Sequence, residues 1–222
     1  MTSSKTRPAH APATTRAKVL AAAERLLGEG SADFSMRDLA AAAGVSFATP
    51  FNQFGSKLEI MRALSAERIE RMHRRAATAA SADSVQRVLD VVAIAAAVMT
   101  ETPRVNRAVM AAIGAPGSQP CPEPGAIRER SRALWAEALG DAACLSPAHR
   151  ALGRLVLPDQ LAIAFRGVLS FWTAGEIQDP DLRPSALASA AALLFGFVDA
   201  PRQAVLAELM RPESVIRSNG IV

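Results

Sequence analysis

The sequence predicts an all-α protein of about nine or ten helices. Half of its 222 residues are hydrophobic, which is enough for a sizeable core. Alanine is the commonest residue, β-branched and aromatic side chains are sparse, and tyrosine is absent, so the composition favours helix over strand. Apolar residues recur at helical spacing along the chain, and no alternating run of strand length occurs.

Capping residues and glycines divide the first sixty residues into short helices. Thr14 or Thr15 can begin a helix that runs to about Glu29 and ends at Gly30. We expect its apolar face to be formed by Val19, Leu20, Ala23, Leu26 and Leu27.

A second helix of two turns follows. Ser35 begins it, because Ser35 and Asp38 have the spacing of a capping box. It ends at Gly44, since glycine readily adopts the left-handed backbone of a sharp turn. Ser46 can then cap a third short helix that reaches about Gln53.

A long fourth helix begins after the break at Gly55, with Ser56 as its cap. Its expected buried side comprises Leu58, Met61, Leu64 and Met72. Further along, apolar spacing predicts a fifth helix over 85–99, a sixth from Pro103, and a seventh over about 127–138. Two long apolar helices are expected at about 158–176 and 185–199, and a last one from Pro201. The Gly- and Pro-rich segment 114–125 is expected to be a loop.

The second and third helices match a helix-turn-helix. Ala40 is small where two helices must cross closely, Gly44 makes the turn, and Val45 is expected to fill the space between the helices. In such a unit the second helix lies in the major groove of DNA, with its N-terminal residues near base edges.

The distribution of charge agrees with a polyanionic partner for this end of the chain. Residues 1–80 contain 12 Lys and Arg against 7 Asp and Glu, whereas residues 81–222 contain 13 against 14. All three lysines lie within the first 60 residues. Scattered charge in an arginine-rich chain is the alternative interpretation.

Residues 14–60 resemble the DNA-binding domain of TetR-family transcriptional regulators. The resemblance rests on VLAAAERLLGEG, then FSMRDLAAAAGVS, then ATPFNQFGSKLEI, with AGVS at 43–46 and Ser-Lys at 56–57. It implies a three-helix DNA-binding domain at 14–58 and a helical ligand-binding and dimerisation domain at 59–222, in a regulator that is most commonly a repressor. Residues 1–13 are polar with two prolines and are expected to be a flexible arm. No signal peptide is recognisable, so a cytoplasmic protein is expected, and no cofactor is expected.

Three positions depart from the family pattern. Family members usually carry Tyr at Phe51, His at Gln53 and Leu at Pro50, and the tyrosine hydroxyl commonly meets a phosphate. Phe51 cannot make that bond, and we expect both Phe51 and Phe54 to lie in the core. Pro50 lies near the helix start, where its missing N–H costs at most one hydrogen bond.

Roles in DNA binding follow as hypotheses. Ser46, Phe47, Ala48 and Asn52 are candidate major-groove readers, and Phe47 and Ala48 would meet thymine methyl groups. Candidate phosphate contacts are Ser35, Arg37, Thr49 and Lys57, the last at a helix N-terminus. For Lys57, Thr49 and Asn52 the alternative is a solvated surface residue.

A recognition helix of two turns reads only a few base pairs, so we expect a homodimer on a near-palindromic operator of double-stranded DNA. The helices near 158–176 and 185–199 are the expected interface, and the family implies a four-helix bundle formed by the two copies. Small residues alternate with large ones in the second of them (Ala186, Ala188, Ala190, Ala192 and Gly196). Internal core is the alternative role for both helices.

The family also implies a cavity for a small hydrophobic effector, whose binding moves the fourth helix and releases DNA. Candidate lining residues are Met72, Met99, Met110, Trp135, Phe165 and Trp172. Polar candidates are Asn106, Arg107, His73, Arg166 and Gln160. Acidic residues are scarce among them, which favours a neutral or anionic ligand; plain core packing is the alternative.

Other classes have weaker support. The sequence contains no GxSxG, HExxH, Walker-type or GxGxxG pattern, so an enzyme is not expected. Cys121 and Cys144 lack the spacing of a zinc site, which leaves a thiol-based redox-sensing regulator as one alternative. A non-enzymatic helical small-molecule-binding protein is another. The longest apolar run, 91–99, is too short to span a bilayer, and no membrane partner is expected.

Overall fold

The structure is a computed structural model that describes residues 14–78, 81–115 and 125–211. The described residues form ten α-helices and no strand, which confirms the predicted fold class. The chain divides into two compact units, Met1–Ile60 and Met61–Val222, called here the first and second units. The expected arm at 1–13, most of the expected loop at 114–125, and Cys121 lie outside the described residues.

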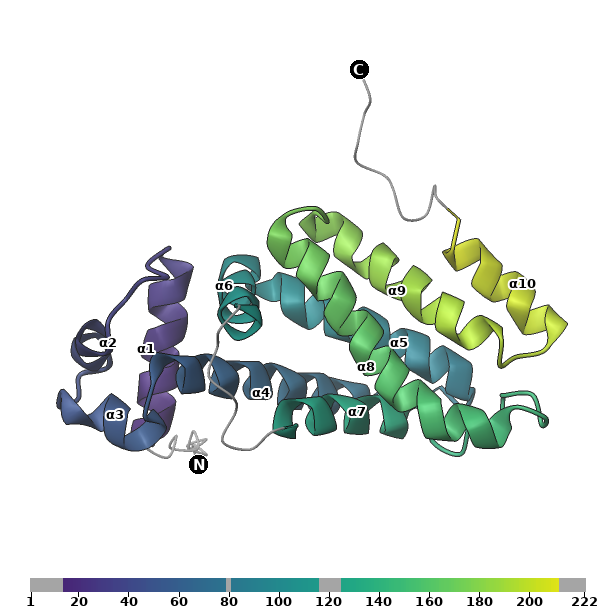
Figure 1. Cartoon of the computed structure of the whole chain (residues 1–222), viewed down its shortest axis with the longest axis horizontal. Helices are drawn as coiled ribbons and strands as arrows, with labels where there is room; N and C mark the ends of the chain where they lie inside the picture. The colour runs from purple at the N-terminus through teal and green to yellow at the C-terminus, as the bar shows by residue number, and fades with distance from the viewer. Residues whose placement is uncertain (1–13, 79–80, 116–124, 212–222) are drawn as a thin grey trace, which may run out of the picture. The chain divides into compact units, whose positions relative to one another are not determined.

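The first unit contains α1 (Thr15–Gly28), α2 (Met36–Ala43), α3 (Ala48–Phe54) and the start of α4 (Lys57–Ala76) (Figure 1). Thr14 caps α1, and its Oγ1 accepts a hydrogen bond from the backbone N–H of Ala17 at 3.2 Å. The core of the unit joins α1, α2, α3 and the start of α4; it includes Val19, Leu20, Leu27, Phe34, Leu39, Phe54 and Ile60.

Two details of the first unit differ from prediction. Ser46 does not cap α3; its hydroxyl bonds Thr49 Oγ1 at 2.7 Å, and the helix begins at Ala48 without a side-chain cap. In α4 the fully buried residue of the first turn is Ile60, while Leu58 is half-buried. Both differences arise within a tight connection, where a shift of one residue changes which side chain faces inward.

The second unit contains the rest of α4, α5 (Ser84–Glu101), α6 (Pro103–Gly114), α7 (Ala126–Leu139), α8 (Arg150–Ala174), α9 (Asp179–Phe195) and α10 (Ala200–Leu209). Helix α8 packs against α6, α7 and α9, and α9 also packs against α5 and α10 (Figure 1). Helix α8 is long and apolar enough to cross a membrane, with a mean hydropathy of 1.2. The core helix of a protein without a membrane span can have the same length and composition.

Both long helices begin earlier than predicted, at residue 150 rather than 158 and at residue 179 rather than 185. Each contains an internal proline, Pro158 in α8 and Pro184 in α9. Proline removes one helical hydrogen bond and usually marks a boundary, so local signals favour a later start. Burial of the first turns of α8 against the rest of the unit overrides that preference; Gly153 and Leu157 are both buried there.

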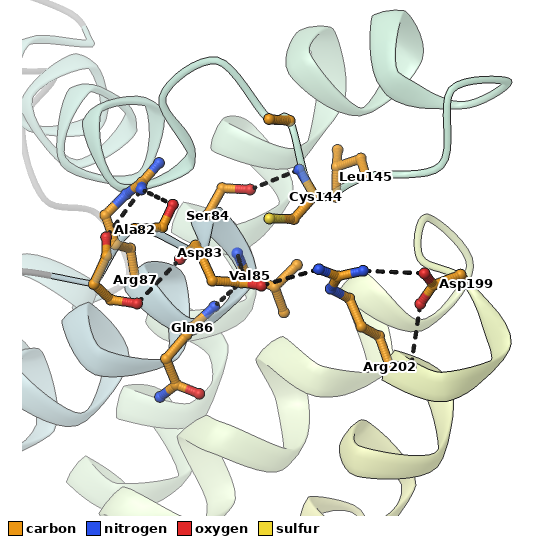
Figure 2. Close-up of polar contacts among 12 residues, drawn as sticks. Ala82, Asp83, Ser84, Val85, Gln86, Arg87, Cys144, Leu145, Asp199 and Arg202 are labelled. Carbon is orange, nitrogen blue, oxygen red and sulfur yellow. Dashed lines mark hydrogen bonds and ion pairs between the residues drawn. The ribbon is translucent and has the colours of Figure 1, made fainter.

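A polar network holds the start of α5 against the distant C-terminal helix (Figure 2). Asp83 Oδ1 accepts from the backbone N–H of Val85 at 2.8 Å and of Gln86 at 3.0 Å, and Asp83 Oδ2 pairs with Arg202 Nη2 at 3.1 Å. Burial raises the pKa of Asp83, but these hydrogen bonds outweigh it and leave the pKa below its ordinary value. Nearby, Cys144 N donates to Ser84 Oγ at 3.4 Å.

Candidate functional site

The turn between α2 and α3 is built as a helix-turn-helix requires. Ser35 and Asp38 form a complete capping box: Ser35 Oγ accepts from Asp38 N at 3.2 Å, and Asp38 Oδ2 accepts from Ser35 N at 2.8 Å. These bonds from Ser35 lower the pKa of the Asp38 carboxyl. Gly44 is left-handed, with φ 65° and ψ 38°, and Val45 N then donates to Ala40 O at 3.1 Å.

Tertiary contacts fix this turn to the rest of the first unit. Ala40 is buried at the helix crossing, while Val45 is half-buried. Arg25 Nη2 donates to Ala42 O at 2.6 Å and so joins α1 to the end of α2. The Arg16 guanidinium lies 4.4 Å from the centre of the buried Phe54 ring at the end of α3. The position of α3 is therefore set from both ends.

A cation and two aromatic rings lie in a row on the outer side of α2 and α3. The Arg37 guanidinium lies 5.5 Å from the centre of the Phe47 ring, and the Phe47 and Phe51 rings meet edge-on at 5.6 Å. Phe47 is 53% exposed and Phe51 43% exposed. Large apolar groups left in solvent beside a cation are typical of an interaction surface.

The second unit contains a cavity of about 390 Å³ that is partly open to solvent. Its lining comes from α4, α5, α6, α7 and α8, with Ile69, Val109, Ile113, Ile127, Leu134, Ala162, Ile163 and Leu169 among the apolar residues. This volume lies within the range of about 300–1,000 Å³ that small-molecule sites occupy.

The polar groups of the cavity are mostly hydrogen-bond donors. Arg68 is buried, and its Nε donates to Asn106 Oδ1 at 2.8 Å, while Asn106 Nδ2 donates to Val98 O and Met99 O. Arg128 pairs with Asp159, Nη2 to Oδ1, at 2.8 Å. Arg166 Nη1 donates to Met110 Sδ at 3.3 Å, and loss of solvent lowers the pKa of this guanidinium. Among the described residues, no Asp or Glu lines the cavity.

Helix α8 leaves one apolar face exposed. Large hydrophobic side chains on it remain in solvent; they are Leu152, Leu155, Ile163 and Phe171, with Leu155 75% exposed. Their spacing places Leu152, Ile163 and Phe171 within one side of the helix, and Leu155 at its margin. Helix α9 and its C-cap carry the half-exposed or exposed small residues Ala188, Ala192 and Gly196, which recur every four residues and so share one side of the helix.

Residues 19–64 match the family model for bacterial regulatory proteins of the tetR family. The N-terminal domain belongs to the TetR family. The match spans α2, the turn and α3 in full, together with most of α1 and the start of α4. No curated protein matched the sequence.

Solved structures of TetR regulators share the fold along most of the chain. A TetR transcriptional regulator from Rhodococcus sp. RHA1 is 21% identical, with a TM-score of 0.65 over 81% of this chain and 96% of that one. CprB from Streptomyces coelicolor in complex with its operator is 20% identical, with a TM-score of 0.51 over 88% of this chain and 94% of that one. SmeT in its complex with triclosan is 16% identical, with a TM-score of 0.53 over 85% of this chain and 93% of that one.

Most predicted DNA-contact residues of the TetR-family domain lie on its surface. Ser35, Arg37, Ser46, Phe47, Ala48 and Asn52 are exposed, and Thr49 is half-buried. The expectation that Phe51 is core is wrong, whereas Phe54 is buried as expected. Pro50 is buried in place of Phe51, because its ring occupies the inner side of the first turn of α3. The tyrosine usual at position 51 was the available signal that this side chain faces outward.

Lys57 differs from the other predicted contacts in its surroundings. Its Nζ donates to Ala32 O at 2.6 Å and to Phe34 O at 2.9 Å, and it lies 4.4 Å from the centre of the Phe34 ring. Loss of solvent lowers the pKa of Lys57, and the Asp33 carboxylate acts in the opposite direction. The phosphate contact of Lys57 stays a prediction, since the ammonium already has two acceptors within the domain.

Five of the six predicted ligand residues line the cavity: Met72, Met99, Met110, Trp135 and Phe165. Trp172 lies elsewhere; its Nε1 donates to Asp179 Oδ1 at 2.8 Å, and the Arg107 guanidinium lies 4.8 Å from its ring centre. Trp172 shares the buried face of α8 with Phe165 but lies two turns further toward the end of that helix, where it contacts the start of α9 and not the cavity.

Of the predicted polar lining residues, Asn106 and Arg166 are present, while Arg107, His73 and Gln160 are not among the lining residues. His73 instead contacts Glu137 Oε2 at 3.1 Å. Sequence reasoning missed Arg68, although it shares the apolar stripe of α4 with Met61, Leu64 and Met72. A charged residue within such a stripe was the signal available for it.

Two other predictions concern small residues and cysteines. Ala186 and Ala190 are buried within the chain, so they cannot face a partner as the alternation on α9 suggests. Cys144 is a half-buried free thiol. Among the described residues, no group of His, Cys, Asp and Glu could hold a metal ion.

Proposed function

We infer that the chain is a ligand-responsive transcriptional regulator that binds a near-palindromic DNA operator as a homodimer in the cytoplasm. The observation that carries this proposal is the TetR-family domain with the exposed row of Arg37, Phe47 and Phe51 on its helix-turn-helix. The fold shared with CprB, whose structure contains its operator, supports it. No catalytic role is proposed.

The proposed DNA contacts divide by chemistry. Phe47 and Ala48 at the start of α3, with Asn52 one turn on, read base edges, and apolar side chains there suit thymine methyl groups. Ser35, Thr49 and Arg37 hold the phosphate backbone, and Ser46 adds a further hydroxyl. We add Phe51, whose ring adjoins that of Phe47, as a residue that contacts the deoxyribose groups along the wall of the groove.

The proposed dimer places α8 and α9 of two copies against each other. The exposed apolar face of α8 supports it, because Leu152, Leu155 and Phe171 would otherwise stay in water. The small residues Ala188 and Ala192 on α9 allow close approach of a second copy.

The proposed effector is a small hydrophobic molecule bound in the 390 Å³ cavity. SmeT was solved with triclosan, which supports a ligand role for a related fold. Binding that favours one arrangement of α4 lowers operator affinity, since α4 begins in the first unit and lines the cavity further along. The proposed action is repression.

The test is selection of bound DNA from a random pool by the purified protein at two salt concentrations. The proposal predicts an enriched inverted repeat, and an Asn52→Ala variant that enriches a less restricted half-site. Arg154 is an exposed residue of α8 in the second unit, so an Arg154→Ala variant serves as the matched control and should select the same repeat. Salt-sensitive binding without any enriched repeat would contradict sequence-specific regulation and favour a small-molecule-binding protein.

A further inference from the structure

The cavity of the second unit has an imbalance of charge and of hydrogen-bonding groups. Three arginines and one indole N–H line it, but no Asp or Glu of the described residues does. Arg128 has the Asp159 carboxylate as its counter-charge, and Arg68 has the Asn106 carbonyl oxygen as an acceptor. The Asp159 carboxylate and the Asn106 carbonyl oxygen are therefore already used by these two arginines.

Within the part of the chain that the structure describes, Arg166 lines the cavity without a carboxylate or carbonyl acceptor of this kind. Its Nη1 has the sulfur of Met110 as its contact, and a thioether is only a weak acceptor. The guanidinium also borders a second cavity of about 250 Å³, which it shares with Ser170 and Thr173. A charged group held at the wall of two cavities with a weak acceptor is poorly stabilised by the chain alone.

Trp135 provides a second, independent observation. The residue is 1% exposed and lines the larger cavity, yet its Nε1 has no hydrogen-bond partner among the described residues. Buried indole N–H groups normally find an acceptor. The same cavity thus holds an unsatisfied neutral donor and an under-compensated cation, and one ligand that carries acceptor oxygens would satisfy both kinds of group.

We propose that the ligand of this cavity is an organic anion with an apolar body, whose carboxylate binds the Arg166 guanidinium. The apolar body lies among Met72, Met99, Phe165 and Leu134, and a further acceptor on the ligand meets Trp135 Nε1. Organic cations are disfavoured, because every charged side chain that the described residues contribute to the lining is positive. This inference rests on the proposed ligand-binding function and specifies the chemical class of its effector.

The test uses calorimetric titration of the full chain, without DNA, with probes matched in body and different in head group. Decanoate, decanol and decylamine form one series, and naphthoate and naphthamide form another. We expect each carboxylate to bind at least about 10-fold more tightly than its neutral counterpart, and decylamine not to bind.

Variants of Arg166 separate charge from shape. Arg166→Met should weaken carboxylate binding about 10- to 100-fold and leave decanol binding unchanged, while Arg166→Lys should give an intermediate loss. Arg154→Met, on the exposed surface of the same helix, is the matched control and should change nothing. Trp135→Phe should weaken binding about 2- to 10-fold, since it removes one neutral donor.

Stability of the ligand-free protein provides a second readout. Arg166→Met should melt at the same or a higher temperature than the unaltered protein, because the substitution removes a desolvated charge. A lower melting temperature with unchanged probe affinity would assign Arg166 a structural role and overturn the proposal. Equal affinity for carboxylate and neutral probes, or no binding of either carboxylate, would also overturn it. Operator selection, being independent of these probes, would still decide the proposed function.

Discussion

Lys57 either stabilises the first unit through its two carbonyl acceptors or contacts a DNA phosphate, and the two roles can be distinguished by measurement. If its ammonium holds the segment between α1 and α2 to the start of α4, Lys57→Met should destabilise the first unit. Two charge-assisted hydrogen bonds and one cation–aromatic contact are lost. The carbonyl of Ala32 can bond water instead, whereas that of the buried Phe34 is less accessible, so we expect a loss of about 1–2 kcal/mol.

Thermal and urea melts monitored by circular dichroism measure this loss. A domain the size of the first unit shifts its melting temperature by about 4–8 °C for each kcal/mol of change in its free energy of unfolding. Lys18→Met is the matched control, since Lys18 is an exposed lysine of the same unit, and its melting should not change. The salt dependence of operator binding gives the complementary reading, because each lost phosphate contact lowers the slope of log K against log salt by about 0.9.

We expect Lys57→Met to keep the salt slope of the unaltered protein, and Arg37→Met, which removes an exposed cation beside Phe47, to lower it by about 0.9. The reasoning is refuted if Lys57→Met melts like the unaltered protein and loses the slope instead. The ammonium would then leave its two carbonyls when DNA binds.

Further predictions concern four sites. Gly44→Ala should destabilise the first unit by about 1 kcal/mol in urea melts, because φ is +65° there; an unchanged midpoint would contradict this. Gly153→Ala should also destabilise, by about 1 kcal/mol after the gain in helix propensity, since its Cβ would lie 2.6 Å from Leu145 Cδ1; a rise in melting temperature would contradict tight packing there. Leu155→Glu should yield monomers in sedimentation, whereas Val205→Glu, at another exposed position on α10, should not. Asp83→Ala should melt lower near neutral pH, and because the folded pKa of Asp83 lies below its unfolded value of about 3.9, the difference should shrink as pH falls below about 4.

The first unit could be predicted from sequence in detail because its signals are local. The capping box of Ser35 and Asp38 and the left-handed Gly44 act within a few residues, and both appear in the structure as expected. The outward position of Phe51 was not predictable in this way. Whether an aromatic ring of α3 faces inward depends on its neighbours, and here Pro50 and Phe54 occupy the inner side.

The second unit depends more on contacts distant in sequence. The starts of α8 and α9 were missed because packing retains an internal proline in each, against its local preference. The methionines and aromatics of the cavity were predicted by residue type, but the exclusion of Trp172 follows from its contacts with Asp179 and Arg107. Which residues line the cavity depends on how several helices pack together, so the apolar periodicity of one helix cannot predict it.

Arg166 is the reason for proposing an anionic ligand, where the sequence alone predicted a neutral or anionic one. Folding alone favours an apolar residue at this position, since the guanidinium loses solvent and gains a thioether contact. Helix α8 supplies enough apolar residues for the core without it, among them Leu161, Phe165 and Leu169. A cation that lowers the stability of the empty protein is best explained by an interaction made only when a ligand is present. The melting temperature of Arg166→Met should therefore stay the same or rise, while its affinity for carboxylate probes should fall.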